Sequence, residues 1–238
     1  MSPTPSIELT FHGHACIGLR TPTAHLCIDP VPAAGFAGFS DLLPLPDHFT
    51  HAVATHAHAD HSAFREVTSA CALPLPGLRE DSVPGLRIES RLAPHDEYGG
   101  RLRGGMTHLL RITVDDAGAG PLTIVHAGDL GEVPAGGLLA WLRERPIDVL
   151  ILPVGGYYVL SPWSALETIC LCRPRTAVPV HAADQGIPLP VMAPLEALLR
   201  LVPAALRVSS WRPEHLPDPD TSAAPHLTVL EPAGVRRD

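Results

Sequence analysis

Residues 55–62, with the sequence THAHADHS, constrain this chain more than any other segment. The apolar residues 51–54 before them predict a buried strand. Side chains of an extended chain alternate in direction, so the first three potential ligands of the segment point to one side, and the fourth joins them only where the chain turns. The four potential ligands, in the pattern H-x-H-x-D-H, are His56, His58, Asp60 and His61.

A turn is expected directly after these ligands, because Ser62 is a suitable N-cap for a short helix over residues 63–70. Neutral imidazole suits zinc, and a carboxylate adds charge and orients a bound water. Neighbouring groups in one loop diverge, so we expect two ions, each completed by ligands from elsewhere in the chain. The alternative, a solvated histidine-rich loop, does not explain the regular spacing.

The H-x-H-x-D-H pattern resembles the signature of the metallo-β-lactamase superfamily. Residues 11–19 (FHGHACIGL) and 26–30 (LCIDP) are similar to the opening of its lactonase-like and phospholipase-D-like branches. The resemblance implies that His14 and Asp29 lie beside the metal site. For His14 the competing interpretation is a turn histidine bonded to backbone, and the sequence does not separate the two.

Residues 94–107 contain a His-Asp pair, a glycine pair and then Arg-Gly, and they resemble a bacterial hydrolase subgroup of that superfamily. The match makes His95 a metal ligand. His108 competes, but it lies inside a predicted strand, whereas His95 ends one, and chemistry is usually carried by loops. Arg103 either binds an anionic group of the substrate or orders the glycine-rich loop, and the second role is slightly favoured.

Two later motifs are similar to the remaining ligand positions of the superfamily. H-A-G-D ends at Asp129, which would bridge two cations, since one carboxylate can span ions about 3.5–4 Å apart. V-P-V-H ends at His181, the final ligand. One departure lies at residues 159–161, where Val-Leu-Ser replaces the Thr-Ile-Asp of the subgroup.

The resemblance therefore implies a binuclear centre with two divalent ions, zinc being expected and manganese or iron the alternatives. A metal-bound hydroxide would cleave a lactone, ester or phosphodiester in a small molecule, with Asp60 and His14 as the catalytic side chains. The first ion would take His56, His58 and His95, the second Asp60, His61 and His181, and Asp129 would bridge them.

The fold that the resemblance implies is an α/β four-layer αββα sandwich, two mixed sheets flanked by helices, in a single domain over residues 1–238. The length suits one domain with a full core. The predicted strands are 7–11, 15–19, 25–29, 51–54, 86–93, 108–114, 122–126, 148–153, 176–180, 205–209 and 226–230. The predicted helices are 63–70, 138–145, 162–172 and 191–201. Residues 30–47 are predicted to form a long loop.

Charge and composition limit the partners of the chain. Its formal net charge is −8, and its 17 basic residues, all arginine, form no basic run, which argues against nucleic acid. We see neither a signal peptide nor a membrane-spanning segment, so we expect a cytoplasmic protein that binds a small-molecule substrate and no membrane. The five cysteines are expected to be reduced. A homo-oligomer is left open.

Two other functions remain open at this point. One is an iron-dependent enzyme that uses oxygen or carries out redox chemistry on the same fold, because iron accepts similar ligands. The other is a non-catalytic relative that binds metal only for stability. Metal analysis separates the first from a hydrolase, and turnover of esters and phosphodiesters separates the second.

Overall fold

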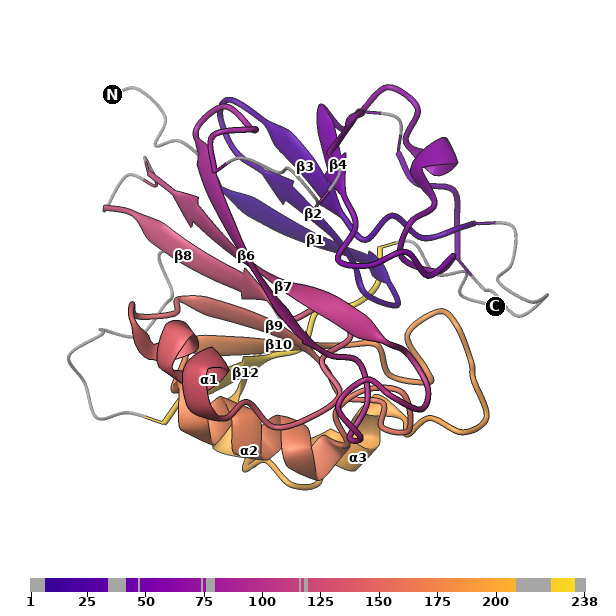
Figure 1. The fold of residues 1–238 in the computed structure, drawn as a ribbon, viewed down its shortest axis with the longest axis vertical. Helices are drawn as coiled ribbons and strands as arrows, with labels where there is room; N and C mark the ends of the chain where they lie inside the picture. The colour runs from indigo at the N-terminus through magenta and orange to yellow at the C-terminus, as the bar shows by residue number, and fades with distance from the viewer. Residues whose placement is uncertain are drawn as a thin grey trace.

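Two β-sheets face each other in the computed structural model (Figure 1). The model describes residues 7–33, 42–46, 48–73, 75, 80–115, 117, 120–208 and 224–233. The smaller sheet has the strand order β1-β2-β3-β4-β5, and the larger has the order β11-β12-β10-β9-β8-β7-β6.

Each sheet is mixed, and the hairpins explain why. In the smaller sheet β1 (Glu8–Gly13), β2 (Cys16–Arg20) and β3 (His25–Ile28) pair antiparallel, whereas β4 (His51–Val53) and β5 (Cys71–Leu73) continue in parallel. Short turns permit the antiparallel pairs, while a parallel pair needs a longer crossover. The prediction of two mixed sheets is confirmed.

The larger sheet repeats this arrangement. Strands β6 (Leu86–Pro94), β7 (Met106–Val114) and β8 (Leu122–His126) are antiparallel. The remaining strands, which run parallel to β8, are β9 (Val149–Pro153), β10 (Thr176–Val180), β11 (Arg207–Val208) and β12 (His226–Thr228). The crossovers from β8 to β9 and from β9 to β10 contain α1 (Gly136–Arg143) and α2 (Pro162–Cys172).

The apolar side chains of β9 show how the layers form. Val149 and Ile151 belong to the core between the two sheets, whereas Leu150 and Leu152 belong to the core beneath the helices. This alternation follows from the two-residue repeat of a strand. A continuous apolar run therefore marks a strand that is covered on both faces, as the sequence predicted.

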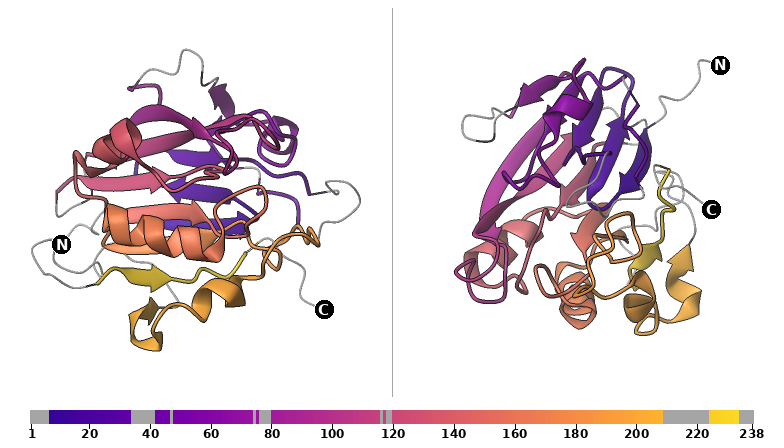
Figure 2. Two further views of the ribbon diagram at one scale, coloured as in Figure 1. Left: turned by 60° about the horizontal axis from the view of Figure 1, so that its bottom comes forward. Right: turned by 90° about the vertical axis from the view of Figure 1, so that its right-hand side faces the viewer.

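Helices cover one face of the larger sheet, where α1, α2 and α3 (Leu195–Leu199) lie side by side (Figures 1 and 2). The outer face of the smaller sheet is covered differently within the described residues. A third apolar cluster there joins Cys16 and Cys27 of the sheet to loop residues such as Phe49, and to Val67 after the 3-10 turn η1 (Phe64–Glu66).

The predicted helix over residues 63–70 is wrong in extent, since only the 3-10 turn η1 forms there. Ser62 is not its N-cap, because Ala63 occupies that position without a side-chain bond. The Ser62 hydroxyl instead donates to the carbonyl of His58 at 2.9 Å. The serine therefore closes the ligand loop and does not start a helix.

Other predicted boundaries shift by a few residues. The helix predicted over 191–201 begins only at Leu195, after Pro194 as N-cap. Residues 205 and 206 of the predicted strand 205–209 belong to the 3-10 turn η2 (Ala204–Leu206). Residue 209 lies outside the described residues, as do 34–41 and 47 of the predicted loop. Within the part of the chain that the structure describes, no helix is long and apolar enough to cross a bilayer.

Candidate metal centre

The seven predicted ligands converge from loops at one edge of the two sheets. Residues 56–61 follow β4, and His95 follows the last residue of β6. Asp129 comes shortly after β8, and His181 directly follows β10. The carboxyl ends of parallel strands meet at one edge of a sheet, which explains why residues far apart in sequence lie together here.

Three histidines form the first group of donor atoms. His56 Nε2 lies 3.0 Å from His58 Nδ1 and 3.2 Å from His95 Nε2. Nitrogens bound at the usual distance to a tetrahedral zinc ion lie about 3.3 Å apart. The spacing of these three nitrogens therefore fits one ion with room for further ligands.

The Asp129 carboxylate lies between this group and the second one. Its Oδ2 is 3.1 Å from His95 Nε2, 3.2 Å from His61 Nε2 and 3.3 Å from His181 Nε2. Its other oxygen, Oδ1, is buried and has no hydrogen-bond partner among the described residues. A carboxylate that faces histidines of both groups has the placement needed to bridge two ions.

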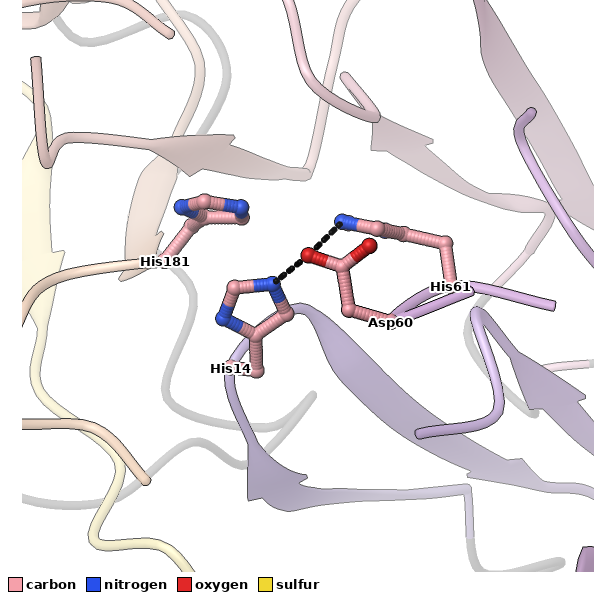
Figure 3. A group of neighbouring side chains, drawn as sticks. All are labelled: His14, Asp60, His61 and His181. Atoms are coloured by element: carbon pink, nitrogen blue, oxygen red, sulfur yellow. Dashed lines mark hydrogen bonds and ion pairs between the residues drawn. The ribbon is translucent and has the colours of Figure 1, made fainter. Parts of the chain in front are cut away.

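The second group contains Asp60, His61 and His181, with His14 beside them (Figure 3). One oxygen of Asp60, Oδ2, accepts a hydrogen bond from His14 Nε2 at 3.1 Å and lies 3.8 Å from His61 Nε2. The His14 ring also packs on the His181 ring, with 3.8 Å between centroids. The centroid of the His14 ring also lies 5.0 Å from that of His61, so His14 contacts all three expected ligands of this group.

Several buried nitrogens of the second group lack partners. His61 Nε2 and both ring nitrogens of His181 form no hydrogen bond with the described residues. An unsatisfied buried polar group costs about 1–3 kcal/mol. A divalent ion between the two carboxylates would satisfy His61 Nε2 and His181 Nε2, so the donor set fits a metal.

Polar neighbours orient the histidines of the site. Asp29 is fully buried, accepts hydrogen bonds from Thr55 N at 2.6 Å and Thr55 Oγ1 at 2.8 Å, and binds His61 Nδ1 at 3.0 Å. The His61 ring therefore donates from Nδ1 and turns Nε2 toward the site. His95 is held likewise, since its Nδ1 donates to the Tyr158 carbonyl at 3.1 Å. Carboxylates and carbonyls commonly orient metal-binding histidines in this way.

Three residues of the candidate centre have a strained backbone conformation. His14, Asp29 and His181 have positive φ angles of 54°, 52° and 58°. Residues other than glycine seldom adopt this conformation, and it persists where the surrounding structure enforces it, often at functional sites. The His14 carbonyl accepts the His181 N–H at 2.6 Å, so the β1–β2 turn directly positions the last predicted ligand.

Sequence reasoning missed Gln185, which holds the loop after β10. The side-chain amide of Gln185 accepts the Ala182 N–H at 3.0 Å and donates to the Pro179 carbonyl at 3.2 Å. The backbone carbonyl of Gln185 accepts the His14 N–H at 2.5 Å. No motif marks this residue. Its role follows only from the contact between the β1–β2 turn and the loop after β10.

Two glycines permit close approach at the site. A Cβ on Gly104 would lie 2.1 Å from His95 Nδ1, and one on Gly128 would lie 2.4 Å from Thr107 Oγ1. Gly128 also has a φ of 53°, which favours glycine. The glycine-rich loop after β6 is thus packed directly against His95.

His108 lies apart from these groups. It belongs to β7 and lines a second cavity with Phe64 and Met106, which His56 also borders. Among the described residues, its ring nitrogens join no set of donor atoms close enough to hold one ion, so it stands outside the two groups. The structure places His95, and not His108, against Asp129. This agrees with the preference drawn from the sequence, while the ligand role itself stays a prediction.

Burial and charge set opposite protonation states in the cluster. Burial lowers the pKa of His56 to about 3, with His61 adding repulsion. Burial and the neighbouring His181 lower the pKa of His14 to about 4. Burial also disfavours the charged form of His61, but Asp129 and Asp29 outweigh it and hold the His61 pKa well above its ordinary value.

The carboxylates remain ionised in this surrounding. Burial alone would raise the pKa of Asp129, but His181 and His61 hold it well below its ordinary value. In the same way the hydrogen bond from His14 and the charge of His61 outweigh burial and lower the pKa of Asp60. The centre therefore presents two negative charges to a cation.

A cavity of about 260 Å³ opens onto both groups. Its lining includes five of the predicted ligands together with Arg103 from the glycine-rich loop and Tyr158 from the loop after β9. The lining residues are His58, Ala59, Asp60, His95, Arg103, Asp129, Tyr158, His181 and Leu189.

Comparison with known families decides the relationship of the chain. The family described as the β-lactamase superfamily domain matches residues 8–181, which contain all seven predicted ligands. The chain belongs to the metallo-β-lactamase superfamily. The resemblance inferred from its motifs is thereby confirmed.

Relatives of the chain are described as hydrolases. A UPF0173 metal-dependent hydrolase from Pyrobaculum arsenaticum is 28% identical over 195 residues, which cover 74% of this chain and 84% of the relative. The structure is similar to that of a proposed Zn-dependent hydrolase of the same superfamily from Thermotoga maritima. That pair has a TM-score of 0.67, an identity of 22%, and coverage of 94% of this chain and 98% of the other. At the level of enzyme class, the prediction of a metallo-hydrolase is confirmed.

The fold alone does not decide the reaction. CmlA from Streptomyces venezuelae, a diiron β-hydroxylase, has a TM-score of 0.52 to this chain at 15% identity, over 77% of this chain and 46% of CmlA. Unrelated chemistries recur on one fold, so the function has to be argued from the site.

Proposed function

We propose that this protein is a di-zinc hydrolase that cleaves a lactone, ester or phosphodiester bond in a small molecule. The observation that carries this proposal is the position of the Asp129 carboxylate, within 3.1–3.3 Å of nitrogens from His95, His61 and His181. One carboxylate between two sets of donor atoms fits two cations better than one. In the proposal, His56, His58 and His95 hold the first ion, and Asp60, His61 and His181 hold the second.

When bound, two such ions supply an ionised water at neutral pH and polarise a carbonyl or phosphoryl group. The side chains around them have distinct tasks. Asp60 lines the cavity and orients the attacking group through its carboxylate. His14 is fully buried and donates from Nε2 to Asp60, so it acts as a positioning residue and not on the substrate itself.

The ligand set also favours zinc over harder ions. Five of the seven proposed ligands are imidazoles, which suit zinc, whereas magnesium and calcium prefer oxygen ligands. Iron and manganese accept the same donors less strongly, so the native ion has to be measured. The rigid support of His61 by Asp29 and of His95 by Tyr158 is the kind of orientation that such a site needs.

The test combines metal content with turnover. The protein is purified, analysed for transition metals before and after reconstitution, and assayed with a lactone, a carboxylic ester and a phosphodiester. Close to two zinc ions per chain, with hydrolysis of at least one substrate class, supports the proposal. His108→Ala serves as a matched control, because it removes a half-buried histidine outside the two groups.

Two other outcomes would each redirect the assignment. A stable form with one iron that consumes oxygen would favour the redox alternative. A full complement of metal without turnover of any substrate class would favour a non-catalytic, metal-stabilised relative. Absence of transition metal even after reconstitution would refute the binuclear site.

A further inference from the structure

We propose that Arg103 forms the binding site for an anionic group of the substrate, so that the hydrolysed molecule carries a carboxylate or phosphate near the bond that is cleaved. The proposal rests on the hydrolase function and names its substrate class. Arg103 lines the cavity onto which both groups of predicted ligands open. Among the described residues that line this cavity, it is the side chain with a permanent positive charge.

The loop that carries Arg103 is built as a rigid support. Asp96 is fully buried and accepts four backbone N–H groups of the loop, at 2.8 Å from Tyr98, 3.0 Å from Gly100, 3.0 Å from Leu102 and 2.6 Å from Arg103. A carboxylate that binds several backbone groups fixes the loop around itself. The backbone of Arg103 is therefore placed before any ligand arrives.

The guanidinium of Arg103 is also held in one orientation. Its Nη1 donates to Glu97 Oε1 at 2.8 Å and to the Tyr157 carbonyl at 2.7 Å. The group lies over the rings of Tyr98 and Tyr157, at 5.3 and 4.4 Å from their centroids. Aromatic faces attract a cation and define the plane of a guanidinium.

These contacts leave one edge of the guanidinium available. Both hydrogen bonds to described residues start from Nη1, and none links Nε or Nη2 to any residue that the structure describes. The edge formed by Nε and Nη2 matches two oxygens of a carboxylate or phosphate. The side chain is 24% exposed, so a ligand in the cavity can reach it.

The charge of the cavity points to the same ligand class. The positive charge of two divalent ions would exceed the negative charge of Asp60 and Asp129, and Arg103 adds a further positive charge to the lining of the cavity. Glu97 offsets part of this charge, but its side chain is 46% exposed and does not line the cavity. An anionic substrate would therefore be attracted and oriented toward the ions.

The competing role for Arg103 is structural, because its bond to Tyr157 ties the loop after β6 to the loop after β9. A structural role predicts equal losses for all substrates, together with lower thermal stability. Recognition predicts a loss that depends on the charge of the substrate. Arg101→Met is the matched control, since Arg101 lies on the same loop, is exposed and does not line the cavity.

The experiment compares the zinc-loaded wild type with Arg103→Met, Arg103→Lys and Arg101→Met. The substrates are two activated esters, p-nitrophenyl butyrate, which is neutral, and mono-p-nitrophenyl succinate, which is anionic. The ratio of kcat/KM for the anionic over the neutral ester should fall about 10- to 100-fold in Arg103→Met, as expected for lost hydrogen bonds to a charged group. This ratio should fall less in Arg103→Lys, which keeps the positive charge but lacks the paired N–H donors of a guanidinium. It should stay at the wild-type value in Arg101→Met.

Binding measurements separate this proposal from the hydrolase function. Calorimetric titration with inorganic phosphate and with succinate should show affinity lowered in Arg103→Met, and the more strongly affected anion identifies the preferred group. An unchanged ester ratio together with unchanged anion affinity would overturn the role of Arg103. If the wild type hydrolyses neither ester, the proposed function is at fault, and the anion titrations decide the role of Arg103 on their own.

Discussion

The two groups of predicted ligands differ in how firmly the protein holds them. In the second group His61 is fully buried and His181 nearly so, and Asp29 and His14 bind its members from behind. In the first group His58 is exposed at the cavity and has no supporting hydrogen bond to a carboxylate. We therefore expect the second ion to be held in a fixed geometry, and the first to exchange more readily with solvent.

The motif therefore contributes donors to two groups that differ in rigidity. Within H-x-H-x-D-H, His58 lies exposed at the cavity, whereas His61 is buried against Asp29, because the chain turns after His58. A rigid ion site preserves geometry, whereas an open site leaves room for a substrate to displace water. The predictions below test this difference, from the largest expected effect to the smallest.

The largest effect is expected at the residue shared by both groups. Asp129→Asn keeps the size of the side chain but removes the charge that compensates two cations. Metal content should fall at both positions, and activity should fall by more than about 100-fold, since loss of outer partners alone costs up to that much. Elemental analysis, turnover and circular dichroism measure these effects together. A fully active variant with two metals would show that Asp129 is not a bridge.

The next effect should be confined to the first group. His95→Ala removes one of the three imidazole nitrogens of the first group, so the first ion should be released while the second remains. His108→Ala, which lies outside the groups, should keep both ions. Metal content of the two variants after gel filtration decides the matter. The reverse result would mean that the register through residues 95–108 has been misassigned.

A smaller effect should be confined to the second group. Asp29→Asn keeps the hydrogen bond to Thr55 as acceptor but loses the charge that orients His61. The affinity for the second ion should fall about 10- to 100-fold, as for other outer partners of metal-bound histidine, with the first ion much less affected. Competition with a chelator measures both affinities. Asp115→Asn, an exposed change outside the site, is the control.

Proton release should also distinguish the two groups. In the metal-free protein Asp129 and Asp29 raise the His61 pKa well above its ordinary value, whereas burial lowers that of His58. A metal needs the neutral imidazole, so binding at the second position should displace the His61 proton at pH 7. The affinity there should rise with pH until the raised pKa is passed. When zinc is titrated into the metal-free protein in a weakly buffered solution, a pH-indicator dye should detect about one proton released at that position. Release of no proton would contradict the protonation state proposed for His61.

Much of the candidate centre was predictable, because its predicted ligands follow strands whose apolar sequence is easily recognised. Val149 to Leu152 predicted a strand buried on both faces, and period-two alternation then ordered the layers. What the sequence does not contain is the contact between distant turns. Gln185 and the carbonyl of Tyr158 support His14 and His95 across the site, and nothing local in their sequence marks that role.

The misassigned helix after the motif has a similar cause. Ser62 followed by a run of helix-forming residues satisfies the local rule for an N-cap, but the tertiary structure uses the segment otherwise. Its hydroxyl is taken by the carbonyl of His58, and Val67 is drawn into the cluster over the outer face of the smaller sheet. Local preference is a weak signal where packing has other demands.

The smallest effect concerns this serine and the open first group. Because the Ser62 hydroxyl donates to the His58 carbonyl at 2.9 Å, Ser62→Ala should cost about 0.5–1.5 kcal/mol of stability and weaken the first ion only a few-fold. Ser62→Asp separates the two interpretations of this position. Aspartate is a good N-cap but cannot donate a hydrogen bond when ionised, so it should be at least as harmful as alanine if the hydroxyl acts as a donor. Thermal unfolding of the metal-free proteins and chelator competition for the first ion measure the two parts. A Ser62→Asp protein as stable as the wild type would restore the helix-cap role, and the turn after His58 would then owe its shape to backbone contacts alone.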